Sequence, residues 1–299
     1  MTNSNREYFS NIAFFDSGQG GLTIWENVVK KIPTLNTCYL GDNARCPYGN
    51  KSEEIITKYT QEATNFLISE NAKMIIIACG TASSVAANIV KKKHSIPIIG
   101  IVEIFCEYIS TILQNKNLTV AIIATRFTIK SDRFVHELNK YNIKKIWTKA
   151  CPLFVPLVEE GISIGNLADA ACELYLWDIP SDTQIIMLAC THYPRLSLAI
   201  AKTVSKKLNR SVILKTHNGD WTLALIENQL RNPVYLVDAS ISVIDQIEKF
   251  IYQDDELLAS VSHKKRKTYC TDSPSQFTSV AKYFSKLPLG NIEMVNVER

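Results

Sequence analysis

The sequence lacks a run of about 20 consecutive apolar residues, the length that a membrane-spanning helix requires. Its first ten residues are polar and carry no apolar stretch of the kind found in secretory signals. Net charge is also low, at +4 over 299 residues, and no aromatic residues interleave with the short basic runs at 91–93 and 264–267. We therefore expect a cytoplasmic protein that binds neither a membrane nor nucleic acid.

The cysteines lack the spacing of a metal site or a disulfide framework. There is no Cys-x-x-Cys pair and no histidine at zinc-finger distance, so we expect no structural metal. Several cysteines lie inside apolar runs, where a free thiol behaves as a small buried hydrophobe. A reducing compartment fits all eight: Cys38, Cys46, Cys79, Cys106, Cys151, Cys172, Cys190 and Cys270.

Short apolar runs alternate with longer amphipathic segments along the whole chain. The runs are continuous rather than alternating, which is typical of parallel strands that are buried on both faces. We predict strands at Ile12–Phe15, Thr37–Leu40, Met74–Ile77, Ile98–Val102, Thr119–Ile123, Ile185–Leu188 and Val212–Leu214. Helical spacing is found at Ser52–Ile68, Ser83–Lys93, Ser131–Lys140 and Leu167–Leu176. This order of elements indicates the α/β class.

Two of the predicted strands end in the same dipeptide. Ala78-Cys79 and Ala189-Cys190 stand 111 residues apart, about the length of one α/β domain, and each is followed by small or hydroxyl residues. Two related halves would then each present a thiol where open α/β sheets bind their ligands. The alternative is that two strands end in Ala-Cys by chance.

A pair of opposed thiols suits stereoinversion at a carbon atom. The proton must leave one face and return to the other, so one thiolate and one thiol are needed. A helix N-terminus or a nearby cation brings a thiol pKa towards neutrality, and both cysteines precede predicted helix starts. His192 beside Cys190 and Asp16 near Cys79 are the groups that we expect to move or orient protons.

Other segments offer ligand contacts, each with a structural alternative. The glycines of FDSGQGGL allow close approach of a ligand to the backbone, although Thr23 stands where a dinucleotide loop would have its third glycine. The loop GDNARCPYG can present backbone donors or simply connect two elements. The hydroxyls after the strand at 119–123 can hold a carboxylate or cap a helix. The acids of CPLFVPLVEEG can serve the site or lie on the surface.

Taken in order, these segments resemble the glutamate racemase family. The resemblance rests on FDSGQGGL, GDNARCPYG, ACGTAS, ATRFTIKS, CPLFVPLVEEG, ACTHYPRL and the closing YCTDSPSQFTSVAKYF, and spans most of the chain. It implies two similar α/β domains that face each other across a cleft, with residues 1–103 and 215–299 in the first and residues 104–214 in the second. It also implies interconversion of L- and D-glutamate without pyridoxal phosphate or another cofactor, to supply peptidoglycan synthesis, and a homodimer.

By motif match, the resemblance also assigns roles to individual residues. It implies that Cys79 and Cys190 exchange the proton, assisted by Asp16, Glu159 and His192. The positions that match substrate contacts are Asp16, Ser17, Pro47, Tyr48, Gly49, Gly80, Thr81, Thr125, Thr128, Thr191 and His192.

One departure bears on function: Gly80 stands where the family has asparagine. Loss of an amide that bonds substrate costs about 0.5–3 kcal/mol, which weakens turnover or changes the substrate. A racemase for aspartate or another acidic amino acid is therefore one alternative. A weakly active homologue that acts by binding a protein such as gyrase is another. The paired thiols argue against a decarboxylase relative that keeps one.

Overall fold

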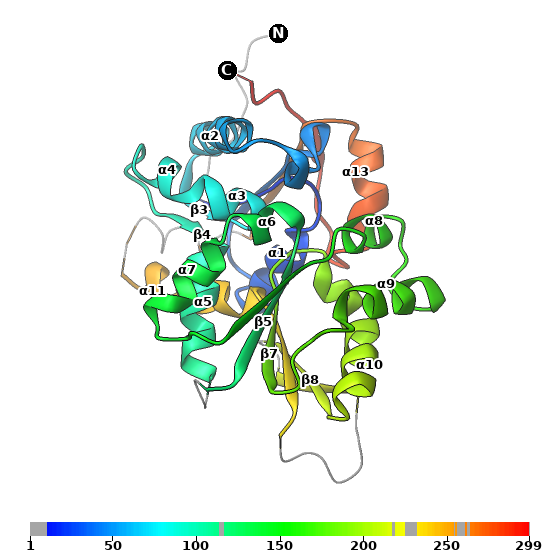
Figure 1. Ribbon diagram of the computed structural model, residues 1–299. Coiled ribbons are helices and arrows are strands. Elements are labelled where there is room, and N and C mark those ends of the chain that lie inside the picture. Colours follow the sequence, from blue (N-terminus) through cyan, green and yellow to red (C-terminus); the bar gives the residue numbers. More distant parts are fainter. Residues whose placement is uncertain are drawn as a thin grey trace.

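The chain folds around two β-sheets, and both ends of the chain belong to the same one. The computed structural model describes residues 11–113, 117–216, 219–224, 232–253, 255, 261 and 264–298, and within them each sheet has six strands. The two ends of the chain, blue to cyan and orange to red in Figure 1, lie together above the green and yellow middle. We call the parts around the two sheets the first half (11–100 and 264–298) and the second half (119–238). The predicted α/β class is confirmed.

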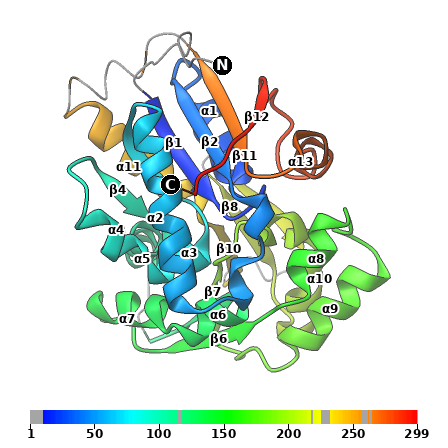
Figure 2. The same ribbon diagram turned by 90° about the horizontal axis from the view of Figure 1, so that it is seen from above.

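The first sheet is parallel throughout, and its central strand is buried on both faces. Along β1 (Asn11–Asp16), Ile12 and Phe14 join one apolar cluster, whereas Ala13 and Phe15 join the cluster on the opposite face. This alternation follows from the two-residue period of a strand. In order across the sheet (Figure 2), the strands are β12 (Ile292–Met294), β11 (Arg266–Cys270), β2 (Thr37–Gly41), β1, β3 (Ala72–Ile77) and β4 (Ile98–Gly100).

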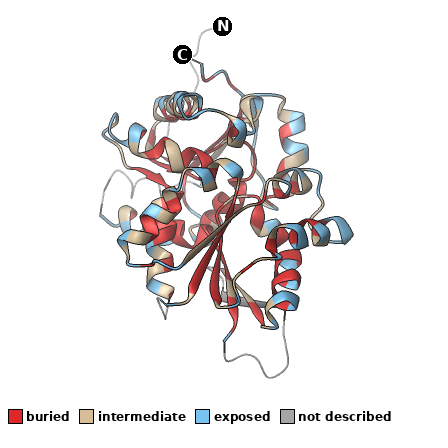
Figure 3. Cartoon of the chain, viewed as in Figure 1, coloured by how far each residue is buried: buried red, intermediate tan, exposed pale blue. Residues whose placement is uncertain are grey.

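The second sheet has five parallel strands and one antiparallel strand at its edge. Its order is β6 (Ile146–Ala150), β5 (Thr119–Ala124), β7 (Thr183–Leu188), β10 (Val234–Asp238), β8 (Val212–Thr216) and the antiparallel β9 (Gly219–Ala224). The central strands β5 and β7 are buried along their whole length, as Figure 3 shows by their red colour.

The strands of the second sheet extend further along the chain than the predicted division between residues 214 and 215. β10 pairs in parallel with both β7 and β8, and β9 pairs with β8, so residues 219–238 belong to the second sheet. The predicted strand at 98–102 is also too long, because β4 ends at Gly100 and the next helix begins at Ile101. We propose that the second domain ends near Asp238.

Helices follow most strands, and several begin at a side-chain cap. Ser52 accepts a hydrogen bond from the Ile55 amide at the start of α2, with two glutamates in the first turn. The α-helices are α1 (Leu22–Lys31), α2 (Glu53–Ser69), α3 (Gly80–Val85), α4 (Ala87–Lys91), α5 (Ile101–Ile112), α6 (Arg126–Lys130), α7 (Arg133–Lys140), α8 (Phe154–Glu159), α9 (Asn166–Leu176), α10 (Ser197–Leu208), α11 (Ser240–Ile251) and α13 (Pro274–Ala281). The 3₁₀ turns are η1 (Asn43–Arg45), η2 (Tyr48–Asn50) and η3 (Tyr193–Leu196).

The two halves pack directly against each other. From the second half, α6 contacts both η2 and α3 of the first half. One apolar cluster continues from the first half, with Phe14 and Ile76, into the second half, with Ile122 and Leu188. Among the described helices, none is both long and apolar enough to cross a membrane.

Candidate active site

The two predicted catalytic cysteines follow the ends of β3 and β7, one in each half. Cys79 is the N-cap of α3, where its Sγ accepts from the Ala82 amide at 3.5 Å and donates to Ser17 Oγ at 3.4 Å. Burial, and then the charge of Asp16, raise the pKa of the Cys79 thiol to about 12. Cys79 is therefore a thiol at neutral pH, ready to give a proton.

Cys190 has a different partner, the imidazole of His192. Their Sγ and Nδ1 atoms lie 3.9 Å apart, and Nε2 of the same ring lies 3.1 Å from Glu159 Oε1. Burial alone would lower the pKa of His192, but its contacts with Cys190 and Glu159 raise it to about 10. At neutral pH the ring is an imidazolium that can donate to Glu159 and to a thiolate at Cys190.

Asp16 lies between these two arrangements and is 1% exposed. Its Oδ1 accepts from the Gly18 amide at 3.0 Å, and its Oδ2 accepts from Thr191 Oγ1 at 3.5 Å. Burial raises the pKa of this carboxyl, and the positive charge of His192 and the hydrogen bonds oppose that effect. Asp16 therefore joins the glycine-rich loop of the first half to the turn that carries Cys190.

Three threonine hydroxyls meet across the boundary between the halves. Thr81 Oγ1 lies 3.2 Å from Thr125 Oγ1 and 3.3 Å from Thr128 Oγ1, and the last two lie 3.0 Å apart. Thr125 also caps α6, with its Oγ1 accepting from the Thr128 amide at 3.3 Å. Helix capping and ligand binding are thus compatible at Thr125. A carboxylate placed here could accept several of these hydroxyl hydrogens at once.

The glycine-rich loop lies against the Cys190 turn. A Cβ at Gly20 would overlap Thr191 Oγ1 and stand 2.6 Å from His192 Nδ1, so this position has no room for a side chain. Thr23 Oγ1 donates to Gly20 O at 2.9 Å and is 3.3 Å from Thr191 O. Gly20 therefore allows the loop to pack closely against the Cys190 turn, and Thr23 holds the two segments together there.

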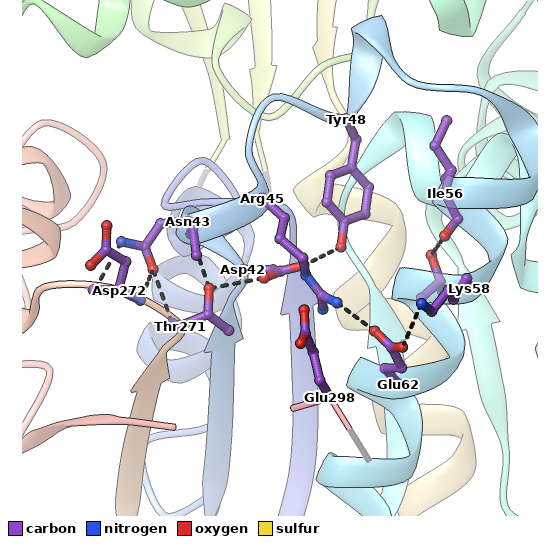
Figure 4. A network of polar contacts seen from close by, with 12 residues as sticks. Asp42, Asn43, Arg45, Tyr48, Ile56, Lys58, Glu62, Thr271, Asp272 and Glu298 are labelled. Carbon is purple, nitrogen blue, oxygen red and sulfur yellow. Dashed lines mark hydrogen bonds and ion pairs between the residues drawn. The ribbon is translucent and has the colours of Figure 1, made fainter. Parts of the chain in front are cut away.

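The loop of Pro47, Tyr48 and Gly49 is held by a buried polar network (Figure 4). Asp42 accepts from Arg45 Nε at 2.7 Å, from Thr271 Oγ1 at 2.8 Å and from the Tyr48 hydroxyl. Since the Tyr48 ring is buried in the first half, its hydroxyl is committed to Asp42. Pro47 is exposed beside it, and Gly49 lies against Thr125 of the second half.

The donor set does not suggest a metal centre. Within the residues that the structure describes, no three side chains of His, Cys, Asp or Glu form a group that could hold a metal ion. The thiols, the imidazole and the carboxyls instead form pairs suited to proton transfer.

Comparison with known proteins identifies the family of this site. The model of the Asp/Glu/Hydantoin racemase family matches residues 24–215. The chain belongs to this racemase family. It is 31% identical to the glutamate racemase of Geobacter metallireducens, over 96% of this chain and 97% of that protein. It is 41% identical to the glutamate racemase of Persephonella marina, over 64% of this chain and 73% of that protein.

Solved racemase structures share the whole fold. Glutamate racemase from Francisella tularensis, in complex with D-glutamate, matches with a TM-score of 0.81 and 30% identity, covering 97% of this chain and 98% of that chain. The Thermus thermophilus glutamate racemase, in complex with β-chloro-D-alanine, matches with a TM-score of 0.78 and 28% identity, covering 98% of this chain and 99% of that chain. The two-sheet arrangement of this chain is therefore the racemase arrangement.

Two features of this racemase site are not evident from its sequence motifs. The Phe284 ring lies edge-on to the His192 ring, 4.8 Å between centroids, and is 2% exposed. The buried Asp42 carboxylate organises the network that holds the loop at 47–49. Phe284 belongs to the C-terminal segment, whose apolar residues predict packing but not the partner against which they pack. Asp42 stands in the GDNARCPYG motif, and an acid there could equally have been a surface residue.

Glu159 should control the pH at which the His192 imidazolium loses its proton. In Glu159→Gln one of the negative charges that raise the His192 pKa is removed, so the folded-state pKa falls from about 10 towards its ordinary value. We expect the alkaline limb of kcat/KM for glutamate to move about one pH unit lower, the low end of the effect of one charge, because Glu159 is partly exposed.

Glu160→Gln is the matched control, because Glu160 is the exposed acid next in the chain, whereas the His192 ring pairs with Glu159. Its pH profile should follow the unmodified protein. Coincident alkaline limbs for all three proteins would contradict the role of Glu159.

Proposed function

We propose that this racemase interconverts L- and D-glutamate by a two-base mechanism with Cys79 and Cys190, and so supplies D-glutamate for peptidoglycan. The observation that carries the proposal is the pair of cysteines at the ends of β3 and β7, on the two sheets of a fold shared with glutamate racemases. The turns that carry the two cysteines meet, because a Cβ at Gly80, next to Cys79, would lie 2.7 Å from the carbonyl oxygen of Ala189, next to Cys190.

The two cysteines differ in environment, and that difference suggests the resting protonation state. In this proposal Cys190, whose Sγ lies 3.9 Å from Nδ1 of the His192 imidazolium, is the base, whereas burial and then Asp16 keep Cys79 protonated by raising its pKa. Cys190 then removes the α-hydrogen of the enantiomer that presents it on that side, and Cys79 delivers its own proton to the opposite face. The reverse reaction starts from the opposite protonation state.

Substrate binding is assigned to polar groups that line the boundary between the halves. The hydroxyls of Thr81, Thr125 and Thr128 would donate hydrogen bonds to a carboxylate in place of their contacts with one another. Asp16, with Ser17 beside it, supplies the buried negative group that suits the ammonium of an amino acid. Thr191 and the backbone of 47–49 complete the proposed contacts.

Exchange of the α-hydrogen with solvent tests the function directly. We expect loss of the α-proton NMR signal of L- and D-glutamate in D₂O, and decay of the circular dichroism of either enantiomer to zero. L- and D-aspartate form the comparison. Faster exchange with aspartate than with glutamate would reassign the substrate. The absence of exchange with every acidic amino acid would reject the enzymatic function in favour of a binding role.

We also propose a homodimer, formed through the apolar face of α8 and α9. Three large side chains are exposed there: Leu153 (47%), Leu167 (64%) and Leu174 (58%). Exposed apolar patches of this kind usually mark interfaces, and a second copy would cover the same patch on both chains.

Leu174→Lys should convert this dimer to a monomer in sedimentation velocity, because two buried lysines would face each other near the axis. Ile89→Lys, a similar change on α4 of the first half, should leave the dimer intact. A monomeric unmodified protein at micromolar concentration would reject the dimer without affecting the racemase proposal.

A further inference from the structure

The imidazole of His192 is enclosed by segments that lie far apart in the sequence. On the glycine-rich loop, the position of an added Cβ at Gly20 lies 2.7 Å from His192 Cε1, so the ring lies directly against this backbone. On the C-terminal segment, the Phe284 ring packs against the imidazole with 4.8 Å between centroids and 75° between the ring planes. Both contacts come from the first half, whereas His192 belongs to the second. Rotation of the imidazole would therefore disturb both contacts.

The neighbouring Tyr283 packs against the turn that follows Glu159. Helix α8 ends at Glu159, and its last turn closes with a hydrogen bond from the Gly161 amide to Val158 O at 2.9 Å. Gly161 has a φ of +75°, and the position of its added Cβ lies 2.8 Å from two ring carbons of Tyr283. Glycine fits both this backbone conformation and the space beside the tyrosine ring. Tyr283 therefore packs directly on the end of the helix that carries Glu159.

Tyr283 and Phe284 are consecutive, so one short stretch of chain contacts both partners of the Glu159–His192 pair. The pair is joined by a contact of 3.1 Å between His192 Nε2 and Glu159 Oε1. Phe284 is 2% exposed, and its amide donates to Ala281 O at 2.9 Å, at the end of α13. The two aromatic rings are therefore anchored by a helix of the first half.

The imidazole of His192 serves Cys190 in one orientation of its ring. Nδ1 faces the Cys190 sulfur at 3.9 Å while Nε2 faces Glu159. A half turn of the ring would put carbon atoms in place of both nitrogens. The charged or titratable groups that act on the ring are Glu159 on α8, Cys190 in the same turn and Asp16 at the end of β1. What holds the ring in this orientation therefore keeps a cation beside Cys190.

We propose that Tyr283 and Phe284 are positioning residues, which hold Glu159 and His192 together and so keep the imidazole directed at Cys190 before the substrate binds. This role rests on the proposed two-base racemisation, in which Cys190 is the base. Neither aromatic ring is assigned a contact with the substrate. An aromatic pair of this geometry favours one arrangement over others by a factor of about two to ten.

Phe284→Leu tests this role in the pH dependence of kcat/KM, which reports groups of the free enzyme. Leucine keeps the position apolar but lacks the ring against which the imidazole packs. We expect kcat/KM for glutamate at neutral pH to fall by about two- to tenfold. The contacts with Cys190 and Glu159 raise the pKa of His192, so their loosening should lower it. The alkaline limb should then move down by roughly 0.3–1 pH unit, since a tenfold change corresponds to one unit.

The same effect should be measurable without turnover. Titration of the His192 ring signals by NMR gives the pKa of His192 directly, and Phe284→Leu should lower that pKa by as much as it lowers the alkaline limb. Tyr283→Leu removes the ring that packs on the Gly161 turn and leaves Phe284 in place. It should shift the titration in the same direction.

A Glu159→Gln background provides a further check on the route of the effect. One of the two contacts that Phe284→Leu loosens is already changed in this background. The added shift in the His192 titration should therefore be smaller than the shift that Phe284→Leu causes alone. An equal shift in both backgrounds would show that Phe284 does not act through the Glu159–His192 pair.

Phe277→Leu is the matched control. Phe277 lies on α13, is fully buried and packs edge-on against Tyr39, with 6.4 Å between centroids, inside the first half. We expect this change to lower the melting temperature as Phe284→Leu does, and to leave both the His192 titration and the alkaline limb in place. A general loss of stability therefore cannot imitate the expected result.

The titration separates this role from the proposed function. An unchanged His192 titration in folded Phe284→Leu and Tyr283→Leu would overturn the positioning role and leave the two-base mechanism standing. An equal shift in Phe277→Leu would overturn it as well. If Phe284→Leu does not fold, Tyr283→Leu decides by the same criterion. A protein that exchanges no glutamate would overturn the proposed function, although its His192 would still titrate.

Discussion

Replacing either Cys79 or Cys190 by alanine is expected to lower racemisation of glutamate by at least about a thousandfold, because a general acid or base contributes about 10²–10⁴-fold and the remaining thiol reaches only one face of the carbon. The assay follows circular dichroism from both enantiomers. Alanine occupies less space than cysteine, so both variants should remain folded.

Cys172→Ala is the matched control for this loss. Cys172 is fully buried on α9 of the second half, and its sulfur takes no part in the proposed site. We expect nearly normal turnover with a small decrease in melting temperature. Retention of full activity in either Cys79→Ala or Cys190→Ala would reject the two-base mechanism.

The single-cysteine variants should still exchange hydrogen on one face. Cys79→Ala retains the Cys190–His192–Glu159 arrangement. In D₂O it should exchange the α-hydrogen for deuterium only in the enantiomer whose α-hydrogen faces Cys190. Cys190→Ala should act, more slowly, on the other enantiomer. Equal exchange of both enantiomers in one variant would show that the thiols do not serve opposite faces.

His192→Gln is the second change with a large expected effect, a loss of about 10²–10⁴ in kcat/KM. Glutamine is neutral, so it removes the positive charge that stabilises a thiolate at Cys190 and that offsets the buried charge of Asp16. The measurement is the pH profile of kcat/KM, which should lose the limb that belongs to His192.

His136→Gln provides the comparison, since His136 is an exposed residue of α7. Its rate and its pH profile should match those of the unmodified protein. A His192→Gln protein with a normal profile would show that Cys190 needs no cationic partner.

The sequence predicts the fold and the site best where a reactive side chain directly follows a buried strand. Continuous apolar runs locate β1, β3, β5 and β7, because parallel strands buried on both faces carry no alternation. The repeated Ala-Cys ending indicates the two thiols, since ligands of open α/β sheets bind at the carboxyl ends of the strands, and β3 and β7 each end just before a cysteine, one in each sheet.

Other parts depend on contacts between distant segments, which local patterns do not record. The interaction of Phe284 with His192 joins positions 92 residues apart. The apolar sequence of β10 fits either sheet, and only its pairing with β7 and β8 assigns it to the second. Gly80 appeared as a missing amide, whereas the structure places a backbone carbonyl where its side chain would be.

The first half is assembled from both ends of the polypeptide, which imposes an order on its maturation. The second sheet consists of a middle stretch of the chain, whereas β11, β12 and Phe284 leave the ribosome after it. Until then β2 has an unpaired edge and the ring of His192 lacks its aromatic neighbour. A nascent chain can therefore contain both sulfurs before the aromatic neighbour of His192 has been synthesised.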